Sequence, residues 1–229
     1  MSAFRYPDAS CRPPWPTGTV CGVLLNYAGD LETLAPRMRS APYLAPPRAP
    51  ILYLKPRNTW IGPGDAVPLP SSAAGVCVGA TLGAVIGQPC VRVPEREAAA
   101  FVAGLCVIND LTLPHAEVFR PAIKERCRDG FCPIGPGIEL ADRKRLAADH
   151  VMRTYIDGEL RAEWSTQQCV RSIARLLADV TDFMALHTGD ILMIGTPRDM
   201  PLARAGERVA VEIDGIGRIE NPIVAEEAA

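Results

Sequence analysis

Polar side chains that could bind a small acidic molecule recur at the ends of apolar segments of the sequence. Asn109 and Asp110 end the segment 104–110 (GLCVIND), in which four apolar residues follow a glycine. This pattern is typical of a buried strand, and such a strand would deliver the amide and the carboxylate to one place. Asp110 could instead cap the next turn, and these residues alone leave both interpretations open.

Cationic side chains stand at comparable positions. Lys55 follows an apolar strand predicted at 51–54, and the segment 120–136 places several basic residues in a loop with Gly and Pro. Lys55 could equally be a surface lysine, and the loop charges a solvated face. A combined site would suit a small polycarboxylate or oxo acid, because cations bind carboxylates while amides and hydroxyls orient an oxo group. Its members would be Lys55, Asn109, Asp110, Arg126, Arg128, Asp129 and Thr196.

Short strands and few helices are expected to position these groups. The apolar spacing after residue 172 predicts one helix, opened by Ser165 or Thr166 and closed by Gly189. A helix interrupted by Pro36 is predicted after the polar pair Asn26 and Tyr27. This combination favours an α+β, β-dominated domain. Strands are predicted at 19–25, 51–54, 75–87, 104–110 and 191–194, hairpins at 151–164 and 208–220, and a short helix at 94–101.

Composition excludes several classes of protein. The chain has 229 residues, 48% of them hydrophobic, and its net charge is −2 with basic and acidic residues interspersed. No basic patch for nucleic acid is visible, and no apolar run approaches the roughly 20 residues of a membrane span. The sequence also contains no G-x-S-x-G, P-loop or dinucleotide motif. We therefore expect a cytoplasmic protein that binds neither nucleic acid nor membrane.

The N-terminal segment and the cysteines indicate how the chain is divided and how it is held together. Residues 1–18 are rich in proline without periodicity and are predicted to form an extended arm, which leaves residues 19–229 as one domain. The eight cysteines are scattered without a C-x-x-C pair, which indicates free thiols and argues against a zinc site.

Several motifs together resemble the fumarylacetoacetate hydrolase superfamily. They follow one another in the family's order over residues 19–225: LLNY, KPRNTWIGPGD, AVIG, IND, RDGFCPIGP, GDILMIGTP and EIDGIGRIENPIV. Within the superfamily, the segments 43–62 and 120–135 are most similar to the N-terminal half of the isomerase/decarboxylases of 4-hydroxyphenylacetate (homoprotocatechuate) degradation. The resemblance implies a mixed β-roll core with few helices and a dimeric arrangement.

The resemblance also implies a chemistry. Such enzymes decarboxylate 5-oxopent-3-ene-1,2,5-tricarboxylate and isomerise 2-hydroxyhepta-2,4-dienedioate to its 2-oxo form, both through an enolate of a 2-oxo acid. The family holds Mg²⁺ or Mn²⁺ with a Glu-x-Glu pair and an aspartate, since these cations require hard oxygen ligands. It also implies substrate contacts from Asn26, Tyr27, Lys55, Asn109, Arg126, Arg128, Asp129 and Thr196.

The sequence departs from the family at the metal ligands. Aligning AVIG puts Gly79 and Thr81 where the two glutamates belong, so Asp110 alone remains of the three carboxylates. We therefore expect this chain not to bind the cation tightly. The family's histidine falls on Asp30 and its lysine on Arg126, which cannot accept a proton at ordinary pH.

Two hypotheses follow from this departure. In the first, the chain is an active subunit, with Asp110 or Asp30 transferring protons and cationic side chains binding substrate carboxylates. In the second, it is a non-catalytic partner in a pseudo-symmetric heterodimer with a metal-binding homologous subunit. A homodimer is the alternative assembly, and a ligand-binding protein without catalysis is the weaker option.

Overall fold

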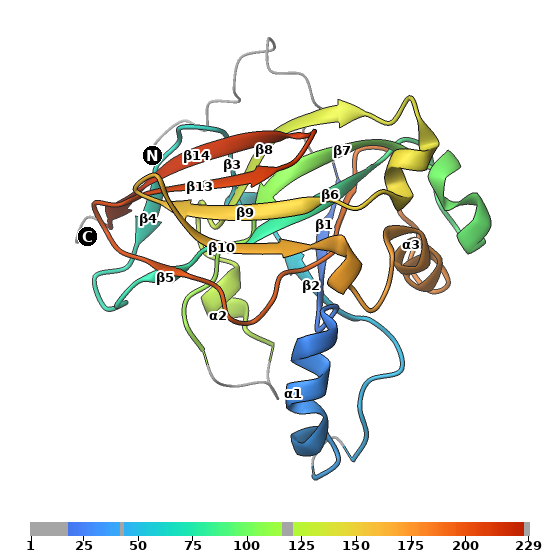
Figure 1. Ribbon diagram of the computed structural model, residues 1–229, viewed down its shortest axis with the longest axis horizontal. Helices are drawn as coiled ribbons and strands as arrows, with labels where there is room; N and C mark the ends of the chain where they lie inside the picture. Colours follow the sequence, from blue (N-terminus) through green and yellow to red (C-terminus); the bar gives the residue numbers. More distant parts are fainter. Residues whose placement is uncertain (1–17, 42–43, 116–120, 227–229) are drawn as a thin grey trace.

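Two large β-sheets lie against each other in the computed structural model (Figure 1), which describes residues 18–41, 44–115 and 121–226. The strand order of the seven-stranded sheet is β2-β1-β11-β6-β7-β8-β3, and that of the five-stranded sheet is β10-β9-β13-β14-β4. The strands are β1 (Val20–Leu24), β2 (Ile51–Lys55), β3 (Trp60–Ile61), β4 (Val67–Leu69), β5 (Val76–Cys77), β6 (Ala80–Ile86), β7 (Val102–Asn109), β8 (Cys132–Glu139), β9 (Val151–Ile156), β10 (Glu159–Ser165), β11 (Ile191–Met193), β12 (Leu202–Ala203), β13 (Arg208–Ile213) and β14 (Gly217–Ala225).

The seven-stranded sheet is strongly curled. Its two outermost strands, β2 and β3, follow each other directly in the chain and are joined only by the short 3₁₀ helix η1 (Arg57–Thr59). The indole Nε1 of Trp60 donates a hydrogen bond of 2.8 Å to the carbonyl of Lys55 across this connection. The edges of the sheet are therefore held close together, which confirms the mixed, β-dominated α+β fold expected from the sequence.

Alternation of side chains along the strands creates two separate cores. On β6 and β7, residues such as Leu82 and Leu105 belong to the main core between the sheets. Their neighbours Val85, Cys106 and Ile108 belong to a smaller core on the other face of the curled sheet. A residue just beyond the end of β6 or β7 therefore points to one face or the other, depending on whether it lies an even or an odd number of positions from these residues.

The predicted long helix is shorter than expected. Helix α3 (Ile173–Thr181) begins after Ser172, whose side chain accepts a hydrogen bond from the backbone N–H of Arg175. Ser165 instead forms a capping box on the 3₁₀ helix η4 (Thr166–Gln168). The predicted start at Ser165 or Thr166 is thus wrong because two capping residues lie close together, and the predicted end at Gly189 is wrong because the helix stops at Thr181. Leu176, Leu177 and Val180 of the apolar stripe are buried as predicted, whereas Phe183, which follows the helix, is 69% exposed.

Pro36 does not break the helix predicted around it. Helix α1 (Ala28–Met38) runs through Pro36. Pro36 has no N–H to donate to the preceding turn, so the helix lacks one hydrogen bond there, and burial of Leu34 and Met38 on either side of the proline holds its last turn. The other helices are α2 (Ile123–Arg126), η2 (Glu95–Ala100) and η3 (Arg143–Ala147).

Other predictions on the fold can be checked directly. The hairpin β9–β10 turns at Asp157 and Gly158, both with positive φ, as the Asp-Gly pair predicted. The seven cysteines of the described residues are free thiols. The proline-rich arm predicted at 1–18 falls outside the described residues except for Gly18. Among the helices of the described residues, none is long and apolar enough to span a membrane.

Candidate functional site

The polar pair at the end of β7 is divided between two environments. Asp110 has the parity of Ile108 and reaches the face of the smaller core, whereas the Asn109 side chain accepts a hydrogen bond of 3.2 Å from the backbone N–H of Gly79. Strand alternation separates neighbouring side chains. The expectation that the strand delivers both groups to one place is therefore correct for the backbone but wrong for the side chains.

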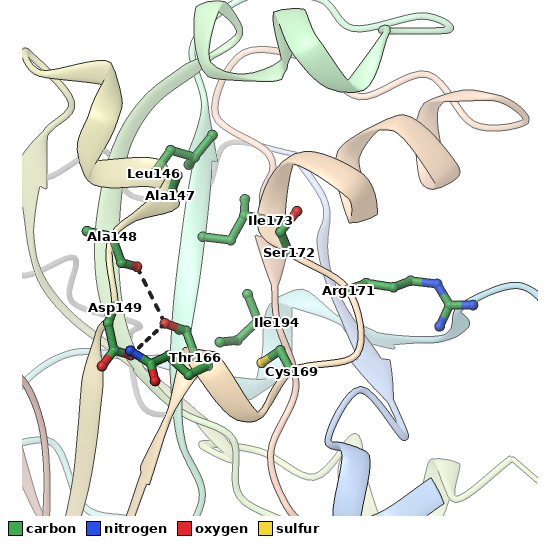
Figure 2. A pocket seen from close by; sticks show the side chains of 11 residues that line it. Leu146, Ala147, Ala148, Asp149, Thr166, Cys169, Arg171, Ser172, Ile173 and Ile194 are labelled. Carbon is green, nitrogen blue, oxygen red and sulfur yellow. Dashed lines mark hydrogen bonds between the residues drawn. The ribbon is translucent and has the colours of Figure 1, made fainter.

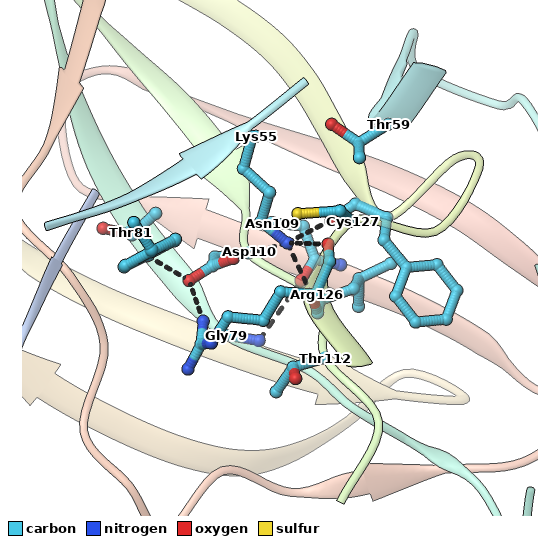
Figure 3. Close-up of polar contacts among 12 residues, drawn as sticks. Lys55, Thr59, Gly79, Thr81, Asn109, Asp110, Thr112, Arg126 and Cys127 are labelled. Atoms are coloured by element: carbon cyan, nitrogen blue, oxygen red, sulfur yellow. Dashed lines mark hydrogen bonds and ion pairs between the residues drawn. The ribbon is translucent and has the colours of Figure 1, made fainter. Parts of the chain in front are cut away.

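Asp110 lies at the centre of a buried charge cluster (Figure 3). Its Oδ1 is 2.8 Å from the ammonium of Lys55, its Oδ2 is 3.1 Å from Nη1 of Arg126, and the same oxygen accepts a short hydrogen bond from the hydroxyl of Tyr53. The side chains of Lys55 and Asp110 are both 0% exposed, and that of Arg126 is 9% exposed. We call these four residues the Asp110 cluster.

Lys55 ties the cluster to the surrounding loop. Besides its ion pair with Asp110, its ammonium donates hydrogen bonds to the carbonyls of Leu111, Arg126 and Phe131, at 2.7, 3.0 and 2.9 Å. An ammonium has three hydrogens, so four acceptors occupy it completely. The predicted interpretation of Lys55 as an ordinary surface lysine is wrong, because the strand β2 directs it into the interior.

Tyr53 reaches Asp110 because a glycine makes room for its ring. Tyr53 pairs with Gly22 of β1, and a Cβ at Gly22 would lie 2.3 Å from both Cζ and the hydroxyl oxygen of Tyr53. The ring also lies 4.6 Å from the guanidinium carbon of Arg126, a cation–π arrangement. Gly22 therefore sets the position of a group that both donates to Asp110 and covers Arg126.

The charges of the cluster stabilise each other. Burial alone would raise the pKa of Asp110, but the neighbouring Lys55 ammonium and Arg126 guanidinium outweigh it and hold the pKa below its ordinary value. Burial would likewise lower the pKa of Arg126, yet the Asp110 carboxylate raises it. Burial and then the Asp110 charge raise the pKa of Tyr53, which keeps its hydroxyl a donor. Asp110 is thus an anion that is already satisfied.

The family's metal ligands can be tested against this geometry. Gly79 and Asp110 are neighbours, since the backbone N–H of Asp110 donates to the carbonyl of Gly79 at 2.8 Å. A Cβ at Gly79 would lie 2.6 Å from Sδ of Met200 and 2.7 Å from Cγ2 of Thr196, so that space is filled. The buried hydroxyl of Thr81 donates to the carbonyl of Gly195 at 2.8 Å.

The residues present do not fit Mg²⁺ or Mn²⁺. Such a cation requires several hard oxygen ligands, and here one carboxylate is available, already in contact with two cations. Within the described residues, no group of three or more His, Cys, Asp or Glu side chains could hold a metal ion. Arg126 supplies the positive charge beside Asp110 that a metal would otherwise bring.

Other predicted site residues lie at the adjoining strand ends. The side chain of Asn26, 1% exposed, donates to the carbonyls of Ile194 and Arg171 and accepts from the backbone N–H of Arg171. Tyr27 is buried and forms an isolated bridge with Cys169. Asn26 and Tyr27 thus fasten the segment before α3 to the end of β11.

Asp30 lies in the first turn of α1 and has a partner outside the Asp110 cluster. Its Oδ2 accepts a hydrogen bond of 3.0 Å from the backbone N–H of Arg198. Burial raises the pKa of this half-buried carboxyl, and the Arg198 contact offsets part of that effect. The pKa of Asp30 is therefore raised, whereas that of Asp110 is lowered.

The remaining predicted residues lie at the margin. Arg128 forms an ion pair with Glu226 at 3.3 Å, and the exposed Asp129 accepts a hydrogen bond from Asn58. Thr196 packs beside Gly79. The structure therefore brings together Lys55, Asp110 and Arg126, while Arg128 and Asp129 have other partners.

A separate pocket of about 190 Å³ opens behind the end of β11 (Figure 2). No residue of the Asp110 cluster lines it. Thr166 closes one side by donating to the carboxylate of Asp149 at 3.2 Å, and Ile194, whose carbonyl binds Asn26, forms another side. The pocket is lined by Leu146, Ala147, Ala148, Asp149, Thr166, Gln167, Cys169, Arg171, Ser172, Ile173 and Ile194.

Sequence reasoning missed Tyr53 and Gly22. Tyr53 and Lys55 are two apart on β2, so they share a face, and this parity could have identified Tyr53 as a partner of Lys55. Nothing in the local sequence indicates that Gly22 stands opposite Tyr53, because that depends on the register between β1 and β2.

Sequence comparison finds one family over most of the chain. A sequence model described as "Fumarylacetoacetate (FAA) hydrolase C-terminal" matches residues 19–224. The chain is 37% identical over 209 residues to the 4-hydroxyphenylacetate degradation bifunctional isomerase/decarboxylase of Escherichia coli, covering 91% of this chain and 48% of that protein. It therefore spans about half the length of the curated relatives it matches.

Solved structures show the same fold. A 5-carboxymethyl-2-hydroxymuconate delta-isomerase from Mycobacterium smegmatis is 30% identical with a TM-score of 0.77, covering 92% of this chain and 80% of that one. A fumarylpyruvate hydrolase from Pseudomonas aeruginosa, solved in complex with Mn²⁺ and pyruvate, is 25% identical with a TM-score of 0.78, covering 93% and 91%. Relatives of this fold thus include an isomerase and a manganese-bound hydrolase.

Proposed function

Because the chain belongs to the fumarylacetoacetate hydrolase C-terminal family, we propose that it is a subunit of an isomerase/decarboxylase that acts on oxo-polycarboxylates. The expected reactions are decarboxylation of 5-oxopent-3-ene-1,2,5-tricarboxylate and isomerisation of 2-hydroxyhepta-2,4-dienedioate. Similarity to the 4-hydroxyphenylacetate isomerase/decarboxylases along 91% of this chain supports the proposal.

Both reactions develop negative charge on an oxygen that is conjugated with the reacting carbon through a carbon–carbon double bond. When carbon dioxide leaves, its bonding electrons pass into an enolate, and in the isomerisation a proton moves from the enol oxygen to carbon. A catalyst must therefore supply a cation near that oxygen and a group that carries a proton. In this chain the cation available is Arg126, because Lys55 is fully occupied by its four acceptors.

Asp30 suits the role of proton carrier better than Asp110. Asp110 is 0% exposed and is stabilised as an anion by two cations, so it has little tendency to accept a proton. Asp30 is half-buried with a raised pKa, which is the direction that general acid–base catalysis requires. If the chain is active by itself, Asp30→Asn should lower kcat more than Asp110→Glu lowers it in protein that remains folded.

The two ion pairs of the Asp110 carboxylate favour the second candidate function, in which the chain is a non-catalytic partner. The single observation that carries it is that both Asp110 oxygens contact cations while Gly79 and Thr81 offer no carboxylate. In this arrangement a metal-binding homologous subunit performs the chemistry, and this chain supplies stability or substrate contacts in a pseudo-symmetric heterodimer.

One assay separates the two candidates. The purified chain is tested alone and then co-purified with a metal-binding homologous subunit, for loss of the tricarboxylate with and without Mg²⁺. Turnover by the lone chain would rule out the partner-only role. Activity that appears only on co-purification, and that persists in Asp110→Asn, would support it. Absence of turnover in both preparations would contradict the isomerase/decarboxylase proposal itself.

A further inference from the structure

The hydrogen-bond donors of the Asp110 cluster are unequally used. All three ammonium hydrogens of Lys55 face acceptors, and the hydroxyl of Tyr53 donates to Asp110. Arg126 differs, because among the described residues its guanidinium donates one hydrogen bond, from Nη1 to Asp110. Its Nε is buried and has no hydrogen-bond partner among the described residues. Arg126 is therefore the member of the cluster that has an unpaired hydrogen-bond donor.

The unused donors share one edge of the guanidinium. In arginine, Nε and Nη2 point the same way, and this edge binds both oxygens of a carboxylate in parallel. Asp110 occupies Nη1 and leaves that edge unpaired within the described structure. A buried donor without a partner costs free energy, and an arriving acceptor would recover it.

The position of Arg126 is fixed rather than adaptable. Its guanidinium is held by Asp110 on one side and by the Tyr53 ring at 4.6 Å on its face, and its own carbonyl accepts from Lys55. A donor edge whose side chain is already ordered loses little entropy on binding. Because the side chain is 9% exposed and its Nε is buried, only a small group such as a carboxylate end can reach this edge, and it must displace the atoms that cover Nε.

We propose that the Nε–Nη2 edge of Arg126 is a metal-independent binding site for one carboxylate of a small oxo acid. This inference rests on the proposed function for its ligand class, but its mechanism concerns this chain alone. The guanidinium is held beside Asp110, and it binds one carboxylate through two N–H donors instead of through metal coordination.

The test uses the full chain, kept in EDTA, with oxalate as the probe. In protein labelled with ¹⁵N at arginine, oxalate is titrated while the Nε–Hε resonances are followed by NMR. The Arg126 resonance, identified by its disappearance in Arg126→Lys, should shift saturably. Calorimetry should show that Arg126→Lys weakens oxalate binding about tenfold or more, since lysine keeps the charge but lacks the paired donors.

A matched control and clear counter-results complete the experiment. Arg161→Lys changes an exposed arginine on β10 that pairs with Glu159, and it should leave oxalate binding unchanged. The inference is overturned if oxalate fails to bind, if binding requires Mg²⁺, or if the Arg126 resonance stays still while oxalate binds elsewhere. None of these results depends on turnover, so they are distinguishable from failure of the proposed function.

Discussion

Two charge triads of this protein share one arrangement, a central charge between two of opposite sign, and differ in where they lie. The buried one joins Lys55, Asp110 and Arg126, with side chains 0 to 9% exposed. The surface one joins Arg153 to Glu163 and Asp214, with side chains 24 to 51% exposed. Each centres on one charge between two of opposite sign.

The difference shows what burial adds to an ion pair. Charges on the surface are screened by water and salt, so their removal changes little. A buried charge that loses its partner has no water to replace it, and the cost falls on the residue left behind. The buried triad also satisfies backbone carbonyls through Lys55, whereas the surface triad holds no loop in this way. Only the buried triad should therefore determine the shape of a site.

The largest effect is expected for Lys55→Met. This change leaves Asp110 with one cation and leaves the carbonyls of Leu111, Arg126 and Phe131 without a donor. The free energy of unfolding should fall by about 4 kcal/mol or more. Urea unfolding measures it, and a loss as small as that of a surface variant would contradict the role given to Lys55.

A smaller, pH-dependent effect is expected for Asp110→Asn, which keeps the shape and removes the charge. The pKa of Asp110 is lowered in the folded protein, so its stabilisation is complete above the unfolded pKa of about 3.9 and is lost as the pH falls through the folded value. The variant should be less stable by about 3 kcal/mol at pH 6.

Acidification provides the check on this comparison. In urea unfolding at a series of pH values, the gap in stability between wild type and Asp110→Asn should narrow below pH about 3.9. A gap that stays constant, or widens, as the pH falls would mean that Asp110 is not held as a buried anion.

The smallest effect is expected for Asp214→Ala in the surface triad. Arg153 keeps Glu163 at 2.6 Å, and water replaces the lost carboxylate. The urea midpoint should match that of wild type within experimental error. A destabilisation comparable to that of Asp110→Asn would remove the distinction between the two triads.

Much of the fold could be predicted because its signals are local. Continuous apolar runs predicted β1, β7 and β11, and Asp157-Gly158 predicted the β9–β10 hairpin. The one strand predicted at 75–87 is divided into β5 and β6. The start of α3 could not be predicted, since Ser165 and Ser172 are both good caps and only packing decides between them. Pro36 misled because burial of Leu34 and Met38 on either side of it, which the local sequence does not show, holds the last turn of the helix.

The site was predictable in its members more than in its geometry. Lys55, Asp110 and Arg126 were expected to share a site, and the structure places their side chains in contact; that they form a functional site stays a prediction. The three hydrogen bonds from Lys55 to backbone carbonyls depend on the path of the 111–131 segment. The contact of the Tyr53 ring with Gly22 depends on the register of the two strands. Such long-range contacts leave no pattern in a single sequence.

The central claim is that Arg126, rather than a divalent cation, neutralises Asp110 together with Lys55. Titration of Mn²⁺ into the EDTA-treated and desalted chain, followed by electron paramagnetic resonance, tests it most directly. The account predicts that the signal of free Mn²⁺ rises in proportion to the metal added, in wild type and in Asp110→Asn alike. Stoichiometric loss of that signal in wild type, absent in Asp110→Asn, would contradict it.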